Sequence, residues 1–269
     1  MKFSIREYMA PGKTIREKFE NLARMGFAGI EIVGSSTAEK LEDILEAAQA
    51  TGVVPNIFSA GGAALLDARG EERRKGIEML KDALSLCGEA GGVGVIYPPL
   101  ISVKMGGRPR IPDLSPLAST QKLEFDLLVS ILKEEIAPHA EKVGARLIIE
   151  PLNRYEQWWP CRLQEGVEIC EAVGSPNVVV MADFFHMNIE EADIAASIRQ
   201  AGSWIYNVHL ADSQRLLPGY GHIDFTEPLA ALKEVGYSYY YGFECGIPGD
   251  PFVELPKAMD YIRRAAGEA

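Results

Sequence analysis

Histidine and cysteine are scarce in this chain, which has only four of each among 269 residues. No two cysteines form a C-x-x-C pair, so their spacing indicates neither a zinc knuckle nor a disulfide framework, and we expect reduced thiols. No apolar run approaches the roughly 20 residues that span a bilayer, and no basic segment followed by an apolar one opens the sequence. We therefore expect a soluble, cytoplasmic protein without a membrane partner.

An excess of positive charge is also missing, because the formal net charge is −11. Proteins that bind nucleic acids through the phosphate backbone need clustered Lys and Arg, so this balance argues against a nucleic-acid partner. No G-x-G-x-x-G motif follows an early strand, which removes the usual dinucleotide-binding signature. The remaining composition, 47% hydrophobic and 24% charged residues, is ordinary for a globular protein.

Short, apolar, β-prone runs alternate with amphipathic segments along the whole chain. The predicted strands are 2–6, 28–33, 53–58, 92–97, 146–150, 177–183, 204–210 and 239–244. The helical segments that follow them are 13–25, 38–50, 71–90, 120–142, 163–173, 190–201, 227–235 and 252–266. Eight strand–helix units at this length favour an α/β fold, a closed (β/α)8 TIM barrel. Because no segment resembles a linker, we expect residues 1–269 to form a single domain.

Four consecutive predicted strands end in residues that can bind a metal: Glu150, Asp183, His209 and Glu244. Their separations of 33, 26 and 35 positions correspond to one βα unit each, and in a barrel such strand ends meet in one site. Three converging carboxylates repel one another unless a cation neutralises them. We therefore predict one shared divalent ion, Mn²⁺ first, with Co²⁺, Mg²⁺ or Zn²⁺ as alternatives. An acid at a single strand end is more often a helix cap, but three acids and a histidine at four consecutive strand ends are hard to explain that way.

Three further polar residues lie near these strand ends in the sequence. Glu156 is either a surface acid or an acceptor for a sugar hydroxyl. His186, three residues past Asp183, is either a solvated loop histidine or a contact to substrate oxygens. Arg215 is either a structural ion-pair partner or a donor to a hydroxyl or carbonyl oxygen.

Two other features allow both a functional and a structural interpretation. Trp158 and Trp159 could form an aromatic wall for a sugar or simply pack in the core. The long connection 98–119 contains Arg108 and Arg110. These arginines could bind a phosphate, but a solvated loop is the preferred interpretation.

Several motifs in the second half of the chain resemble those of a known family, the sugar isomerase/epimerase superfamily with a xylose-isomerase-like barrel. Within it they are most similar to the D-tagatose/D-psicose (allulose) 3-epimerase group. The motifs are Ile149-Glu-Pro-Leu-Asn-Arg-Tyr-Glu156, Ala182-Asp-Phe-Phe-His-Met-Asn-Ile-Glu-Glu191, Val208-His-Leu-Ala-Asp-Ser213 and Pro218-Gly-Tyr-Gly-His-Ile-Asp224.

The resemblance implies one divalent ion held by the four strand-end residues, with Glu150 and Glu244 also acting as the acid/base pair. It further implies that Glu156, His186 and Arg215 bind the substrate. We accordingly expect an isomerase that inverts C3 of a free ketose through a metal-stabilised enediolate. By analogy with such barrels, we expect a homodimer or homotetramer.

Three alternatives remain open from the sequence. Aldose–ketose isomerisation shares the enediolate and the metal site, and differs only in which carbon is reprotonated. An apurinic-site endonuclease shares the barrel but uses a histidine-rich zinc cluster, for which four histidines and a charge of −11 are a poor match. A non-enzymatic barrel could hold the ion for structure or bind a sugar without turnover.

Overall fold

Eight parallel strands form one sheet in the computed structural model, which describes residues 1–34, 37–105, 111 and 113–268. The strand order is β1-β8-β7-β6-β5-β4-β3-β2, so the sheet curls into a nearly closed barrel, as predicted. Across the remaining seam between β1 and β2, one isolated bridge joins Arg6 to Glu31. The strands are β1 (Lys2–Ile5), β2 (Gly29–Val33), β3 (Val54–Ser59), β4 (Gly94–Tyr97), β5 (Leu147–Ile149), β6 (Val178–Asp183), β7 (Ile205–Leu210) and β8 (Tyr240–Phe243).

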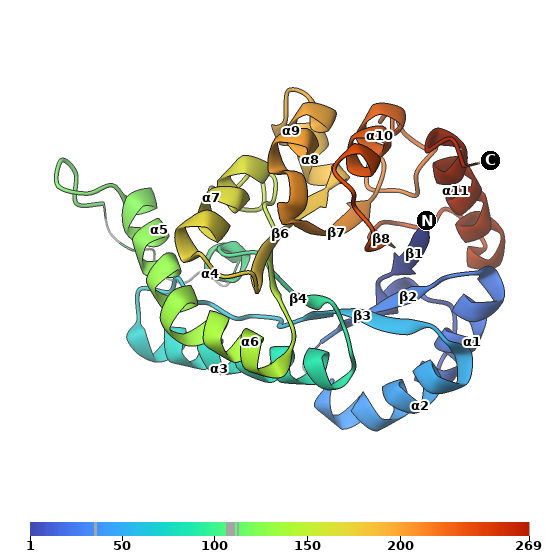
Figure 1. Cartoon of the computed structure of the whole chain (residues 1–269), viewed down its shortest axis with the longest axis horizontal. Coiled ribbons are helices and arrows are strands. Elements are labelled where there is room, and N and C mark those ends of the chain that lie inside the picture. The colour runs from blue at the N-terminus through green and yellow to red at the C-terminus, as the bar shows by residue number, and fades with distance from the viewer. Residues whose placement is uncertain (35–36, 106–110, 112, 269) are drawn as a thin grey trace.

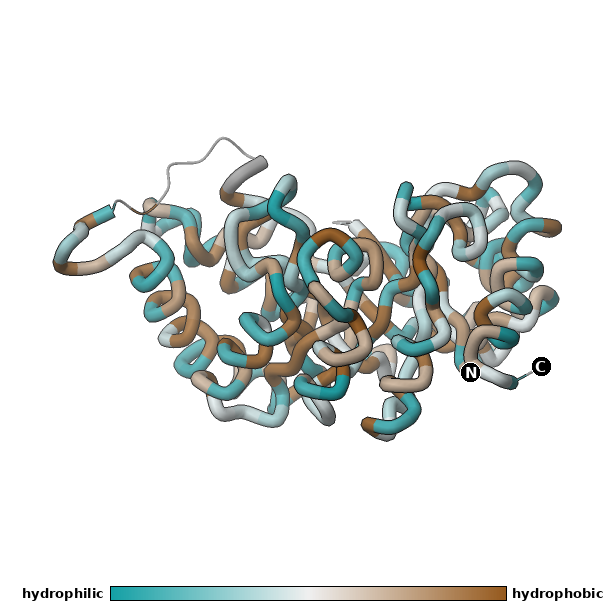
Figure 2. The backbone as a smooth tube through the Cα atoms, turned by 90° about the horizontal axis from the view of Figure 1, so that it is seen from above, coloured by the Kyte–Doolittle hydropathy of each residue, from teal (hydrophilic) through white to brown (hydrophobic). Residues whose placement is uncertain are grey.

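Helices surround this sheet on its outer side (Figure 1). Figure 2 shows polar and apolar residues alternating along them, as in helices with one face against a core. The helices are α1 (Ile15–Met25), α2 (Leu41–Thr51), α3 (Gly70–Glu89), α4 (Ile101–Met105), α5 (Thr120–Ile131), α6 (Ala137–Val143), α7 (Leu163–Val173), α8 (Phe184–Glu190), α9 (Ile194–Ala201), α10 (Thr226–Glu234) and α11 (Pro251–Ala265). None of them, within the described ranges, combines the length and apolarity of a bilayer-spanning helix.

Two predicted helices differ from the observed ones. The segment 120–142 is divided into α5 and α6 by a π-helical turn, Leu132–Ile136. Pro138, in the first turn of α6, has no N–H to continue an α-helical ladder, which accounts for the interruption. The segment 190–201 is preceded by a separate helix, α8, which begins directly after β6 because Asp183 caps it.

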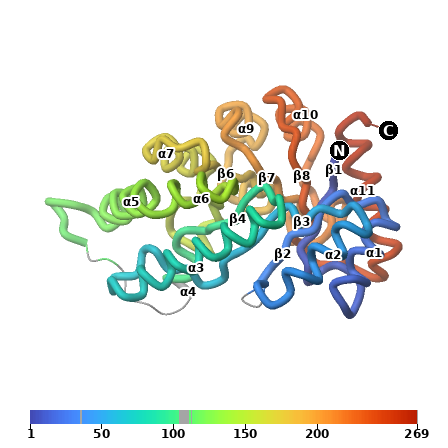
Figure 3. Tube along the Cα trace, turned by 60° about the horizontal axis from the view of Figure 1, so that its bottom comes forward, coloured from blue at the N-terminus to red at the C-terminus, as the bar shows by residue number. Residues whose placement is uncertain are grey.

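The chain ends meet beside the barrel, where β1 lies near α11 (Figure 3). The amino group of Met1 donates to Glu268 Oε2 at 3.0 Å.

The barrel interior is filled by alternate residues of the strands. Ile57, Ile96, Ile148, Val179 and Met181 form an apolar cluster there, and each is at most 2% exposed. Because side chains repeat every second residue on one face of a strand, the inward face of β5 continues from Ile148 to Glu150. The inward face of β6 likewise continues from Met181 to Asp183. The apolar interior therefore ends, at the carboxyl edge of these strands, in carboxylates.

Candidate active site

The four predicted metal ligands converge at the carboxyl end of the barrel. Glu150 follows β5, Asp183 ends β6, His209 lies in β7 and Glu244 follows β8. One ligand atom from each residue, a carboxylate oxygen or an imidazole nitrogen, lies within 4.8 Å of all the others. Glu150, Asp183 and His209 are buried, and only 12% of the Glu244 side chain is exposed. The fold thus assembles residues that are up to 94 positions apart in the sequence.

His209 provides the clearest sign that a cation fits this cluster. Its Nδ1 atom lies 3.3 Å from Glu244 Oε2, 3.4 Å from Asp183 Oδ2 and 3.9 Å from Glu150 Oε1. Although fully buried, Nδ1 makes no hydrogen bond to any part of the chain that the structure describes. Three carboxylates and one neutral imidazole nitrogen form a donor set that suits hard or borderline divalent ions.

Asp183 caps a helix with one carboxylate oxygen and turns the other toward the cluster. Its Oδ1 atom accepts hydrogen bonds from the backbone N–H groups of Phe185 at 2.8 Å and His186 at 3.2 Å, which caps α8. Its Oδ2 atom faces the cluster. The cap fixes the orientation of the carboxylate, and so the second oxygen is held in place for a ligand.

The pKa values of Glu150 and Glu244 shift in opposite directions, because the two carboxylates have different charged neighbours. Burial and the negative charge of Glu244 raise the pKa of Glu150 to about 8. Burial alone would also raise the pKa of Glu244, but the positive charges of Arg6, His209 and Arg215 outweigh it and place this pKa well below its usual value.

His209 and Asp183 respond to the same concentration of charge. Burial lowers the pKa of His209, but the carboxylates of Glu31 and Glu244 outweigh burial and raise it well above its ordinary value. Burial raises the pKa of Asp183, whereas His186 and His209 lower it, and the net shift is downward. Both shifts arise from the opposite charges that the fold gathers in this cluster.

The three residues predicted to contact a substrate surround this cluster. Arg215 donates to Glu156 Oε1 from Nη1 and to Glu244 Oε2 from Nη2, both at 3.1 Å. Its guanidinium lies over the ring of Phe185, 4.7 Å from the centroid. Arg215 is also the one described non-glycine residue with a positive φ, 59°. The ion pairs do not exclude a substrate role, because both partners line the same cavity as Arg215.

His186 is not the solvated loop histidine that the sequence allowed, because it lies in α8 and is only 1% exposed. Its Nδ1 atom is 2.8 Å from Asn153 Nδ2 and accepts a hydrogen bond from the backbone N–H of Asn153 at 3.2 Å. Its Nε2 atom lacks a hydrogen-bond partner among the described residues. That nitrogen lies 3.7 Å from Asp183 Oδ2, and His186 is among the residues that line the cavity.

A cavity of about 180 Å³ lies beside the cluster. Its polar side includes Glu150, Glu156, His186, Arg215 and Glu244. The opposite wall comes from β1, β3 and β4 and their loops, and is mostly small or apolar: Arg6, Ser59, Ala60, Gly61, Gly62, Ala63, Ile96, Tyr97, Pro98, Ile101 and Ser102. A larger hollow of about 420 Å³ near Met1 and Tyr239 has no converging metal ligands among its lining residues.

Two charged residues of the site were not predicted from the sequence: Arg6, which follows β1, and Glu31, which lies in β2. Glu31 Oε2 lies 2.9 Å from His209 Nε2, and both side chains are fully buried. Arg6 donates from Nε to Glu244 Oε1 at 2.7 Å and from Nη1 to Ser59 Oγ at 2.8 Å. A signal was present, since Glu31 is a carboxylate inside an otherwise apolar strand, where an unpaired charge is costly.

The tryptophans pack in the protein and do not form a wall of the cavity. Trp159 is 4% exposed and makes an edge contact with Phe125 of α5, while Trp158 Nε1 donates to Glu124 Oε2 at 2.8 Å. Neither belongs to the described lining of the cavity. Arg108 and Arg110 lie outside the described residues.

Comparison with known proteins agrees with this architecture. Residues 19–265 match the family model described as xylose isomerase-like TIM barrel. A relative from Escherichia coli (strain K12), 3-dehydro-D-guloside 4-epimerase, is 29% identical over 93% of this chain and 95% of its own length. The crystal structure of 3-keto-D-glucoside 4-epimerase from E. coli, 25% identical, covers 98% of this chain and 99% of that one with a TM-score of 0.85.

A second kind of relative carries the name that the motifs predicted. D-Psicose 3-epimerase of Ruminiclostridium cellulolyticum is 42% identical over 104 residues, which are 39% of this chain. The match spans 36% of that relative's length. These names agree with the predicted resemblance to sugar epimerases, which are isomerases. The match along nearly the whole chain shows that this protein belongs to the xylose isomerase-like TIM barrel family.

Proposed function

We propose that this protein is a divalent-metal-dependent epimerase that inverts C3 of a free ketose by removing one proton and returning another. The observation that carries the proposal is the convergence of Glu150, Asp183 and Glu244 around the buried Nδ1 atom of His209, beside a cavity. A proton on the carbon next to a ketone is only weakly acidic, and its removal makes an enediolate. A bound divalent ion would supply positive charge against that developing negative charge.

Glu150 and Glu244 are the two proton carriers in this proposal. They follow β5 and β8, and both residues line the cavity, so in this proposal the sugar binds with opposite faces of C3 toward the two carboxylates. Inversion needs this arrangement, because one group removes the proton from one face and the other returns a proton to the opposite face. Which glutamate acts first depends on the direction of the reaction.

Arg215, Glu156 and His186 would hold the sugar. Arg215 offers donors to a carbonyl or hydroxyl oxygen, and Glu156 accepts from a hydroxyl. His186 lines the same cavity, and its buried Nε2 atom makes no hydrogen bond within the described chain. Together they fix the reacting carbon between the glutamates, which is where positioning contributes to the rate.

Exchange with solvent tests the reaction directly. D-Psicose and L-ribulose are incubated with the enzyme and Mn²⁺ in D₂O, and the deuterium is located by NMR. Label at C3 supports the 3-epimerase, whereas label at C1 or C2 supports aldose–ketose isomerisation. The proposed acid/base pair fails if Glu150→Gln or Glu244→Gln keeps near-wild-type turnover with metal still bound.

Epimerisation at C4 of a 3-keto glycoside is a second candidate function. It is favoured by the 4-epimerase relative, whose match extends over 93% of this chain, whereas the match to the 3-epimerase covers 39%. The chemistry is equivalent, because C4 of a 3-keto sugar is also the carbon next to a ketone. A 3-dehydro-D-guloside added to the same D₂O experiment separates the two candidates, since the 4-epimerase places deuterium at C4.

We further propose Mn²⁺ as the preferred ion, one ion per chain, a single catalytic domain and a homodimer or homotetramer. The donor set supports an ion of this class, and closed symmetric assemblies are the common form of such enzymes. Elemental analysis of the purified protein measures the identity and stoichiometry of the metal. Light scattering coupled to size-exclusion chromatography measures the mass of the assembly against a chain of 29.5 kDa.

A further inference from the structure

We propose that Glu31 is a positioning residue. It holds the His209 imidazole so that Nδ1 is the nitrogen that binds the metal. The inference rests on the proposed metal site, but not on which sugar is converted. Glu31 lies on β2, across the β1–β2 seam from the strands that supply the four ligands. Its Oε2 atom is 2.9 Å from His209 Nε2, and neither side chain is exposed.

The hydrogen bond decides which imidazole nitrogen carries the proton. A neutral imidazole has one N–H donor and one lone pair, and the two can exchange places. A carboxylate beside Nε2 can only accept, so it requires the proton at Nε2 and leaves the Nδ1 lone pair toward Asp183 and Glu244. Carboxylate partners of this kind also increase the basicity of the ligating nitrogen.

The position of Glu31 is itself fixed by its neighbours. Arg6 Nη1 lies 3.5 Å from the same oxygen that contacts His209, and the backbones of Arg6 and Glu31 form the bridge across the seam. Gly242 of β8 provides the space for the carboxylate. A Cβ atom at Gly242 would be 2.3 Å from Glu31 Oε1 but 3.1 Å from His209 Cδ2, so mainly the carboxylate would have to move.

Two variants test positioning in different ways. Glu31→Gln keeps the shape but removes the charge, and its amide can turn to donate to Nε2, which favours the wrong tautomer. Gly242→Ala keeps Glu31, its charge and all four ligand residues, but displaces the carboxylate and shifts the His209 ring by at most a few tenths of an ångström. We expect either change to raise the dissociation constant for Mn²⁺ by about 10- to 100-fold, measured from the electron paramagnetic resonance of free Mn²⁺.

Glu165→Gln is the matched control. It removes one negative charge from a half-buried carboxylate that accepts from the backbone N–H groups of Cys161 and Arg162, and that carboxylate does not line the cavity. We expect its Mn²⁺ affinity to equal that of the wild type. Circular dichroism of all proteins without metal establishes that they are folded, and if Glu31→Gln is not folded, Gly242→Ala decides.

A kinetic readout separates positioning from other roles. Because Glu31 does not line the cavity, saturating Mn²⁺ should restore kcat in Glu31→Gln, with KM for the sugar unchanged. A purely structural role would lower activity regardless of Mn²⁺. A folded Glu31→Gln or Gly242→Ala protein that binds Mn²⁺ within twofold of the wild type overturns the proposal.

The outcome for the wild type separates this inference from the proposed function. A wild type that binds Mn²⁺ but converts no sugar contradicts the epimerase, while the comparison of Mn²⁺ affinities still decides the role of Glu31. A wild type that binds no divalent ion overturns both.

Discussion

The carboxylate of Asp212 anchors the loop between β7 and α10, and replacing it should destabilise both the fold and the site. The side chain is fully buried. Its Oδ1 atom accepts from the backbone N–H groups of Ser213 at 2.8 Å and Ile223 at 3.1 Å, and its Oδ2 atom accepts from Gly219 at 2.9 Å. Three segments of the loop are thereby held by one residue.

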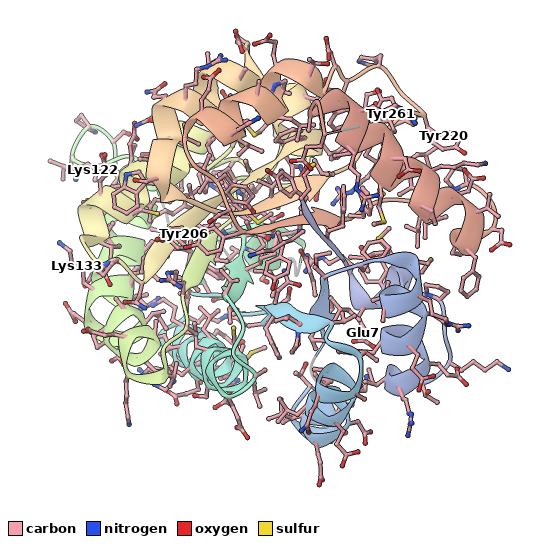
Figure 4. All side chains as sticks on the ribbon, turned by 45° about the vertical axis from the view of Figure 1, so that its right-hand side comes forward. Glu7, Lys122, Lys133, Tyr206, Tyr220 and Tyr261 are labelled. Atoms are coloured by element: carbon pink, nitrogen blue, oxygen red, sulfur yellow. The ribbon has the colours of Figure 1, made fainter. Side chains whose placement is uncertain are left out.

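This loop carries Arg215 into the cavity. The Arg215 backbone N–H donates to the carbonyl of Asp212 at 2.8 Å, and the Arg215 side chain reaches Glu156 and Glu244. The far part of the loop rests against α11, where Figure 4 labels Tyr220 and Tyr261. Loss of the Asp212 anchor should therefore displace Arg215 and weaken substrate binding.

Asp212→Asn is the change we would make first. It keeps the shape but replaces one oxygen by an NH₂ group, so at least one buried N–H loses its acceptor. Hydrogen bonds to a charged group contribute roughly 1.5–3 kcal/mol each, and an unsatisfied buried donor costs roughly 1–3 kcal/mol. We expect the free energy of unfolding to fall by about 3 kcal/mol, which lowers Tm by roughly 6–12 °C for a domain of this size.

Thermal melts and steady-state kinetics measure the two effects. We expect KM for the sugar to rise more than kcat falls, because Arg215 loses its position while the proton carriers remain. Asp224→Asn is the control, since Asp224 is exposed, accepts from the Thr226 N–H at 2.9 Å, and Asn caps such N–H groups about as well as Asp. An Asp212→Asn protein with the Tm and KM of the wild type would refute the reasoning.

The pH dependence of this effect has a definite sign. Burial raises the pKa of Asp212, but the surrounding backbone N–H groups of Gly221, Ser213, Ile223 and Gly219 outweigh it, and the net pKa is lowered. A lowered pKa in the folded state gives stability that is present above the unfolded pKa of about 3.9 and is lost as pH falls through the folded value. The difference in stability between wild type and Asp212→Asn should therefore be constant from about pH 5 to 8 and shrink below about pH 4.

Three further predictions concern the site itself. Chelation of divalent ions with EDTA should abolish turnover, and Mn²⁺ at 100 times its dissociation constant should restore it and stabilise the fold by about 2.7 kcal/mol; activity that survives complete chelation contradicts a metal enzyme. Glu244→Gln should lower kcat by roughly 10²- to 10⁴-fold in samples matched for bound metal, and a kcat within threefold of the wild type would exclude it as a proton carrier. Arg215→Ala should raise KM by about 10- to 100-fold, with Arg199→Ala, which loses an exposed ion pair to Glu234, as the control; equal KM values for the two variants would remove Arg215 from substrate binding.

The barrel and its four candidate ligands were predictable because both depend on local patterns repeated along the chain. Alternating β-prone and amphipathic segments specify the fold class, and a barrel brings the ends of successive strands together whatever the details of packing. Glu150, Asp183, His209 and Glu244 are polar residues at the ends of apolar runs, so their convergence follows from the fold class alone. A π-helical turn divides the predicted helix 120–142 into two. The spacing of apolar residues does not reveal such a turn, because it depends on local backbone geometry.

The partners of these ligands were not predictable in the same way. Glu31 meets His209 across 178 positions of sequence, and Arg6 meets Glu244 across 238. Such contacts depend on which side chains face inward at one level of the barrel, and on whether a neighbour such as Gly242 leaves space. His186 illustrates the same limit, because its ring is buried where α8, which Asp183 caps, packs against β6 and β7.

The sequence by itself therefore determined the fold class, the four residues that can hold a metal and the chemistry that their donor atoms allow. These follow from residue type and periodicity. Tertiary structure decided how the donors are oriented and charged: which nitrogen of His209 faces the carboxylates, which glutamate has the higher pKa, and which wall of the cavity is apolar. These properties depend on distance and burial, which arise only when strands remote in sequence close the barrel around one another.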